Sequence, residues 1–155
     1  MPVTNAFKIP ESVLVVIHTP DLEVLLLERA DQRGFWQSVT GSRAAPGEPL
    51  AVTCAREVAE ETGLARPPAE FDDWNRVNRY AIYPHWRHRY APGVAENTEH
   101  VYGLQVRMKF EPQLAAGEHT AFRWLLWREA ADACFSWTNA QAILALPQRL
   151  AARPR

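Results

Sequence analysis

The stretch that decides the fold is GSRAAPGEPLAVTCAREVAEETGL, residues 41–64. Its second half places three carboxylates beside one arginine on a predicted helix: Glu57, Glu60, Glu61 and Arg56. Residues three and four apart share a helix face, so the carboxylate of Glu57 lies near the other two and like charges repel there. Carboxylate oxygens are ligands that suit Mg²⁺. The pattern indicates a magnesium site, although a glutamate-rich helix end is more often only a solvated surface.

The ends of that helix are marked by a proline and a glycine. Proline is tolerated in the first turn, where Pro49 stands, and glycine is enriched just past the last turn, where Gly63 stands. The sequence therefore predicts a helix over about 49–62. The glycine-bearing loop 41–47 leads into it from a strand-like segment at 35–40. A phosphate substrate would complete a metal site built on this loop and helix.

The spacing of fixed residues in this stretch resembles the signature of Nudix hydrolases, G-x5-E-x7-R-E-U-x-E-E-x-G-U, with U a bulky aliphatic residue. The match is complete from Glu48 to Leu64. One departure stands before it, because six residues rather than five separate Gly41 from Glu48. We place the extra residue in the loop at 43–46, where insertions are tolerated. The resemblance implies an α/β fold, an α/β/α sandwich with a central mixed β-sheet, and hydrolysis of a diphosphate linkage.

The resemblance also assigns roles to charged residues. Glu57 and Glu61 are expected to be metal ligands, with Glu60 as a further ligand or proton acceptor. Arg56 is expected to orient a glutamate through a charge-assisted hydrogen bond. Glu118, which alone would be interpreted as a solvated loop residue, is expected as a third and distant metal ligand. The expected cofactor is Mg²⁺, with Mn²⁺ as a substitute, because displacement at phosphorus requires cations that neutralise charge and activate water.

Five further blocks resemble a narrower bacterial group within that family, the dihydroneopterin triphosphate diphosphatases of folate biosynthesis. The blocks are FWQSVTGS at 35–42, RHRYAPGV at 87–94, NTE at 97–99, EH at 118–119 and SWTNAQAI at 136–143. They imply cleavage of dihydroneopterin triphosphate to the monophosphate and pyrophosphate. Pterin and purine share a bicyclic, hydrogen-bonding shape, so a nucleotide-pool hydrolase acting on dATP or an oxidised purine triphosphate stays open. An inactive Nudix domain that senses a ligand would have eroded glutamates, and here all are intact.

The same resemblance places substrate contacts on cations, a hydroxyl and one strand. Lys8 and Arg29, near strand ends, are expected to grip the triphosphate, and Thr40 is expected to face phosphate. A strand with Tyr80, Ala81, Ile82 and Tyr83 is expected to present aromatic rings and a backbone edge to a flat base. Ser136 is expected to cap the base pocket. Without the resemblance, ordinary packing or solvation would explain these positions better.

The basic loop at 85–94 is open to two interpretations. Arg87, His88 and Arg89 either contact phosphate or pterin, because functional residues favour loops, or form an ordinary solvated surface. Among the six tryptophans, Trp36 is expected to border the site and the others to be mostly core.

Length and composition favour one globular domain. The chain has 155 residues, a length that suits a single domain. Its formal net charge of −1 and its pI near 6.5 argue against electrostatic binding to nucleic acid or a membrane surface. Cys54 and Cys134 give no disulfide framework, no apolar run approaches the ~20 residues that span a bilayer, and no secretion signal is recognised. We expect a cytoplasmic, single-domain protein over 1–155 with a frayed tail at 150–155. Its expected partner is a small pterin or purine triphosphate; the oligomeric state is open, with a monomer favoured.

The remaining hydrophobic pattern predicts a mixed sheet and a second helix near the C-terminus. Strands are expected over 12–19, 23–29, 35–40, 75–83, 99–107 and 122–127, the first two as a hairpin. A helical turn is expected over 128–133 and a helix over 139–146. Thr138 or Asn139 would cap that helix, and it would stop near Pro147.

Overall fold

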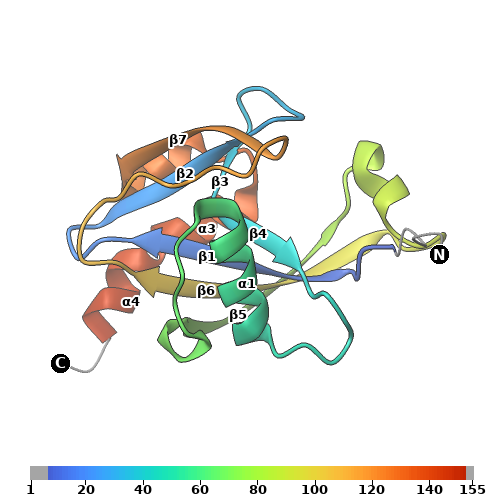
Figure 1. The fold of residues 1–155 in the computed structure, drawn as a ribbon, viewed down its shortest axis with the longest axis horizontal. Coiled ribbons are helices and arrows are strands. Elements are labelled where there is room, and N and C mark those ends of the chain that lie inside the picture. The colour runs from blue at the N-terminus through green and yellow to red at the C-terminus, as the bar shows by residue number, and fades with distance from the viewer. Residues whose placement is uncertain (1–6, 153–155) are drawn as a thin grey trace.

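A computed structural model describes residues 7–152, and a seven-stranded mixed sheet runs through its centre (Figure 1). The strands are β1 (Glu11–His18), β2 (Glu23–Arg29), β3 (Trp36–Gln37), β4 (Val39–Ser42), β5 (Asp72–Ala81), β6 (Glu96–Gln105) and β7 (His119–Leu126). Neighbours follow the order β3-β2-β1-β6-β5, while β4 pairs with β1 and β7 pairs with β2. β1 and β6 run parallel and the other described pairs are antiparallel, which includes the predicted β1–β2 hairpin.

Helices cover both faces of the sheet (Figure 1). α1 (Leu50–Thr62) packs on one face against Val13, Val15 and Ile17 of β1. α2 (Trp127–Ala133), α3 (Trp137–Leu144) and α4 (Leu146–Ala152) pack on the other face, against Leu14 and Val16. Because side chains alternate along a strand, β1 supplies both cores. The predicted α/β/α sandwich is confirmed. None of the helices in the described part of the chain is long and apolar enough to span a bilayer.

The acidic helix α1 has the boundaries that its local signals predict, apart from a start one residue later. Pro49 is the N-cap, with an extended backbone at φ −60° and ψ 140°, and the helix begins at Leu50. Gly63 follows the last turn at φ 78°, the left-handed conformation that favours glycine, and its amide donates to the carbonyl of Ala59. Thr53, Cys54 and Val58 are buried along its inner side, which fixes the rotation of the helix on the sheet.

Two predicted boundaries near the C-terminus are wrong. Ser136 is the N-cap of α3, so Thr138 and Asn139 lie inside its first turn and are buried. Pro147 lies in the first turn of α4, where the missing amide hydrogen is tolerated, and buried Leu146 anchors that helix in the core. Residues 150–152 form the end of α4, in the tail that was expected to be frayed, and 153–155 lie outside the described residues.

The strand β5 starts three residues earlier than predicted, because the chain makes a local bulge. Asn75 has φ 53°, and its amide donates to Asp73 Oδ1 at 2.8 Å. The pairing with β6 shifts register between Asp73 and Arg76 as a result. β5 ends at Ala81, so Ile82 and Tyr83 follow the strand, and the chain turns through the short 3-10 segment η2 (Pro84–Arg89).

Candidate active site

The acidic face of α1 meets the loop that precedes β7. Glu61 from α1, together with Glu118 and His119, places ligand atoms within 4.8 Å of one another. The loop is fixed to the end of β2, because the amide of Ala30 donates to the carbonyl of Glu118 at 2.9 Å. The fold thus brings together two of the three carboxylates expected as metal ligands, although they lie far apart in the sequence.

Glu57, the other expected ligand, is held beside this cluster by Arg56. Arg56 Nη1 donates to Glu57 Oε1 at 2.8 Å, while its Nε and Nη2 donate to the two carboxylate oxygens of Glu48 at 3.1 and 2.9 Å. The bidentate pair lowers the pKa of Glu48 to about 2, because Arg56 stabilises the ionised form. The additional residue before Glu48 leaves this contact intact. Glu60 lies 3.5 Å from Arg56, and its side chain is 55% exposed.

Gly41 lies directly against Glu57. A Cβ at this position would come within 3.0 Å of three atoms of the Glu57 side chain. Gly41 is not among the residues with positive φ, so the close approach requires glycine here and the backbone conformation does not. The glycine that opens the decisive stretch therefore makes room for a candidate metal ligand.

Burial leaves the carboxylates of Glu57 and Glu61 short of compensating charge. Burial raises the pKa of Glu57 to about 7; Arg56 opposes the rise, and Glu60 and Glu118 add to it. Burial raises the pKa of Glu61 well above its usual range, and the negative charges of Glu57 and Glu118 reinforce it. Glu61 Oε2 is buried without a hydrogen-bond partner among the described residues. Carboxylate oxygens with one left unpaired fit a hard divalent cation, which favours their ionised form.

His119 is a residue of this cluster to which the sequence analysis assigns no role. Its Nε2 lies 3.4 Å from Glu61 Oε1 and 3.3 Å from Gln37 Nε2. Burial, reinforced by the charge of Arg29, lowers the pKa of His119 to about 4, so the imidazole is neutral near pH 7. The sequence signal for His119 is its place in the EH block at 118–119, directly after Glu118.

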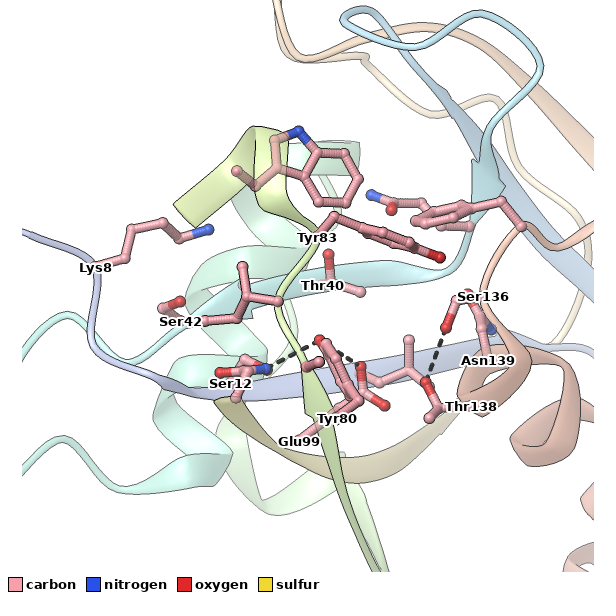
Figure 2. A pocket seen from close by; sticks show the side chains of 18 of the residues that line it. Lys8, Ser12, Thr40, Ser42, Tyr80, Tyr83, Glu99, Ser136, Thr138 and Asn139 are labelled. Atoms are coloured by element: carbon pink, nitrogen blue, oxygen red, sulfur yellow. Dashed lines mark hydrogen bonds between the residues drawn. The ribbon is translucent and has the colours of Figure 1, made fainter. Parts of the chain in front are cut away.

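A cavity of about 380 Å³ adjoins the acidic cluster at Gly41, which lines it. All eight residues predicted to contact substrate line this cavity: Lys8, Arg29, Thr40, Tyr80, Ala81, Ile82, Tyr83 and Ser136. Figure 2 shows Lys8 and Ser136 on opposite sides of the cavity, with Thr40 between them. Lys8, Arg29 and Arg89 form its cationic rim. Burial lowers the pKa of Lys8, and the negative charges of Glu57 and Glu61 oppose that change. The cavity therefore has one side whose charge suits phosphate.

Three rings form an aromatic wall of the cavity: Tyr83, Trp86 and Phe135. The ring centroids lie 5.2 Å apart for Tyr83 and Trp86, and 6.1 Å apart for Trp86 and Phe135, in edge-to-face geometry. Trp36 does not line the cavity, contrary to expectation. It is partly buried and packs against the core, with the guanidinium of Arg123 4.6 Å from its ring centroid. Trp86 takes the place that was expected for Trp36.

Asp31 and Trp86 fix the guanidinium of Arg29. Arg29 Nε and Nη2 donate to the carboxylate of Asp31 at 2.8 and 2.9 Å, and the guanidinium stacks 4.3 Å from the ring centroid of Trp86. The indole of Trp86 in turn donates to Asp31 Oδ2 at 3.2 Å. Hydrogen bonds from Arg29 lower the pKa of Asp31 to about 2. These contacts attach η2 to the end of β2.

The basic loop divides between two surfaces. Arg89 lines the cavity, whereas Arg87 and His88 do not: they line a separate shallow hollow with Tyr90. Arg87 Nε donates to the carbonyl of Ile82 at 3.2 Å, which supports the backbone after β5. Further lining residues were not predicted from the sequence; they include Ser12, Gln37, Trp86, Asn97, Glu99, Phe135, Thr138 and Asn139.

Four similarities to known families, proteins and structures bear on this chain. Residues 8–146 match the model of the NUDIX domain. The chain is 42% identical over 142 residues to the dihydroneopterin triphosphate diphosphatase of Escherichia coli strain K12, covering 90% of this chain and 93% of the relative. It is 38% identical over 140 residues to the Haemophilus influenzae protein of the same name, covering 88% and 87%. The structure of the E. coli dihydroneopterin triphosphate pyrophosphohydrolase superposes with a TM-score of 0.82 at 40% identity, covering 89% of this chain and 94% of that one.

Proposed function

The chain belongs to the NUDIX family, and on that premise we propose that it hydrolyses dihydroneopterin triphosphate to dihydroneopterin monophosphate and pyrophosphate. It is a hydrolase of phosphorus anhydrides, and enzymes of this family generally use a divalent metal ion. Mg²⁺ is the ion that suits the carboxylate cluster, with Mn²⁺ as a substitute. The reaction belongs to folate biosynthesis in the cytoplasm. Two relatives that the chain matches over most of its length carry the name of this activity, which supports the proposal.

The observation that carries the proposal is the junction at Gly41 between the cavity and the acidic cluster. The aromatic wall suits a flat bicyclic ring, and the cationic rim suits the phosphates attached to it. A pterin triphosphate with its ring in the cavity would extend its phosphates past Gly41 toward Glu57 and Glu61. This arrangement puts the anhydride linkage beside the residues that would hold the metal.

Glu57, Glu61 and Glu118 are the residues that would hold the ion. A divalent cation bound there would neutralise phosphate charge and lower the pKa of water. Arg56 positions Glu57 through the 2.8 Å hydrogen bond and is itself fixed by Glu48. Glu60, the most exposed glutamate of the helix motif, is available to accept a proton from the attacking water.

The cationic rim has the complementary task of orienting the phosphate chain. Lys8 and Arg29 face the cavity from two different segments, so together they restrict where the chain lies. Arg29 presents a planar guanidinium that suits bidentate binding to phosphate oxygens. Holding the anhydride in one orientation contributes to rate by removing motions that do not lead to reaction.

Initial rates on three triphosphates test the proposal. We expect kcat/KM in Mg²⁺ to be at least about 10-fold higher for dihydroneopterin triphosphate than for dATP or an oxidised purine triphosphate, because the ring pocket distinguishes the bases. The Glu61→Gln protein, prepared in parallel, serves as the control for contaminating phosphatases. Faster turnover of any of the nucleotides than of the pterin triphosphate would reject the proposal in favour of nucleotide-pool hydrolysis.

A further inference from the structure

The floor of the cavity contains a buried carboxyl group that the proposed reaction does not use. Glu99 of β6 lies opposite Ser12 of β1 and is 4% exposed, yet it lines the cavity. Figure 2 shows Glu99 and Tyr80 on the floor, on a different side of the cavity from Lys8. Arg89, Glu57, Arg29 and Glu61 are charged groups that shift the pKa of Lys8, and they mark the side of the cavity that faces the acidic cluster. Glu99 therefore belongs to the part of the cavity away from the phosphates.

The hydrogen bonds that Glu99 receives within the protein leave it able to accept more. Asn78 Nδ2 lies 3.4 Å from Glu99 Oε1 and the hydroxyl of Tyr80 lies 3.5 Å from Glu99 Oε2, both at the long limit of a hydrogen bond. Burial raises the pKa of Glu99, while donors led by the Thr138 hydroxyl favour its ionised form. A carboxylate offers about four acceptor positions. Because the contacts to Oε1 and to Oε2 are both this long, donors of a ligand in the cavity can compete for both oxygens of Glu99.

Asn97, two residues earlier on β6, adds a second acceptor to the floor. Its amide nitrogen donates to Ser12 Oγ at 2.8 Å and to the Tyr80 hydroxyl oxygen at 3.0 Å. Tyr80 has one hydroxyl hydrogen, and Glu99 accepts it, so the Tyr80 oxygen must accept from Asn97. This arrangement leaves Asn97 Oδ1 buried without a partner among the described residues. A ligand here must supply donors, because an unpaired buried acceptor is costly.

We infer that Glu99 selects the base by accepting hydrogen bonds from the ring N–H and the neighbouring amino group of a 2-amino-4-oxopyrimidine ring. Two parallel donors on one edge match the two oxygens of a carboxylate, whereas adenine presents an acceptor beside a donor on its corresponding edge. The inference rests on the proposed function, since it explains how this site distinguishes pterin from the adenine of dATP. Glu99 is thereby a specificity residue for the ring, and it has no part in cleaving the phosphate linkage.

A glutamine at this position tests the inference, because its amide presents one acceptor and one donor, which suits adenine. The Glu99→Gln substitution should lower kcat/KM for dihydroneopterin triphosphate about 10- to 100-fold, the range expected for losing a hydrogen bond to a charged acceptor. Turnover of dATP should be unchanged or faster. The matched control is Glu96→Gln, which changes the same residue type at an exposed position of the same strand and should leave both rates unchanged.

A binding measurement on the metal-free protein separates recognition of the ring from catalysis. Calorimetric titration of wild type should show neopterin binding about 10-fold or more tighter than its analogue without the 2-amino group, and Glu99→Gln should remove that difference. Equal affinities of wild type for the two pteridines would overturn the inference, even if the variant failed to fold. A variant with an unchanged ratio of pterin to dATP turnover would also overturn it. If instead wild type itself prefers dATP, the proposed function fails.

Discussion

Replacing Gly41 by alanine should remove most of the hydrolytic activity while the fold stays intact. The position is in β4, and its φ is not positive, so alanine adopts the backbone without strain. The added Cβ, however, would come within 3.0 Å of three side-chain atoms of Glu57. Ordinary van der Waals contact begins near 3.4 Å, so the carboxyl must retreat into another rotamer. The change is therefore confined to one candidate metal ligand.

The size of the effect follows from that displacement. Restoring van der Waals contact moves the Glu57 carboxyl by about 1 Å or more, and misplacement on this scale costs about 100-fold in rate. The retreating carboxyl also loses its 2.8 Å hydrogen bond to Arg56. Loss of such an orienting partner lowers metal affinity about 10- to 100-fold. We therefore expect a lower kcat/KM together with a higher Mg²⁺ concentration for half-maximal rate.

Two other glycines provide matched controls. Gly47 lies in the loop between β4 and α1 with nothing within 4 Å of a Cβ, so Gly47→Ala should behave as wild type. Gly103 of β6 lies against Trp74 of the neighbouring strand β5. Gly103→Ala should therefore lower the melting temperature without changing the Mg²⁺ dependence of the rate. Pyrophosphate release titrated with Mg²⁺, alongside thermal melts, measures all three. A folded Gly41→Ala enzyme with wild-type kcat/KM and wild-type Mg²⁺ dependence would refute the assignment of Glu57 as a ligand.

Three further substitutions test separate parts of the structure. Glu61→Gln should abolish metal-dependent pyrophosphate release, and full activity would contradict a ligand role. In calorimetry the metal-free variant should be at least as stable as wild type, because the substitution removes a buried carboxyl group with an unpaired oxygen. Glu48→Gln bears on acid stability: the folded pKa is lowered to about 2 from 4.5, so the carboxylate stabilises the fold above pH 4.5 and that contribution is lost as the pH falls toward 2. Denaturation at a series of pH values should show the variant losing about 1 kcal/mol less than wild type over this window, and parallel curves would disprove it. Gly63→Ala should lower the unfolding free energy by about 1–2 kcal/mol in urea, because its φ of 78° is strained for any residue with a Cβ; an unchanged midpoint would be inconsistent with that conformation.

The helix α1 was predictable from sequence because its signals are local. Its proline start, its glycine stop and its carboxylate spacing all lie within one short stretch. The start of α3 was not predictable from sequence, because Ser136, Thr138 and Asn139 are all residue types that cap helices well. Tertiary contacts decide between them: Asn139 Oδ1 accepts from the amide of Ser38 at 2.8 Å in the core, so it is engaged elsewhere. No local pattern carries that information.

The same distinction separates the predicted from the missed residues of the cavity. Charged residues in a long motif, such as Glu57 and Glu61, are visible because their spacing itself is unusual. Glu99 and Asn97 lie on a strand whose alternation predicts only that they point to one face. Thr138 lines the same cavity as Glu99 and Asn97 only because α3 packs on this face of the sheet. Long-range packing, and not residue type, makes the floor of the cavity.

The contacts among Arg29, Asp31 and Trp86 have a consequence for how fast a triphosphate associates. The guanidinium is already ordered by a carboxylate and an indole, so its rotamer entropy is lost during folding and not during the encounter. The same contacts attach η2, so η2 does not have to close over the cavity before the ligand binds. We expect the association rate to be set by diffusion and by the attraction of the cationic rim, and therefore to fall as salt is raised. In stopped-flow traces this would appear as one phase whose rate rises linearly with ligand concentration and does not level off.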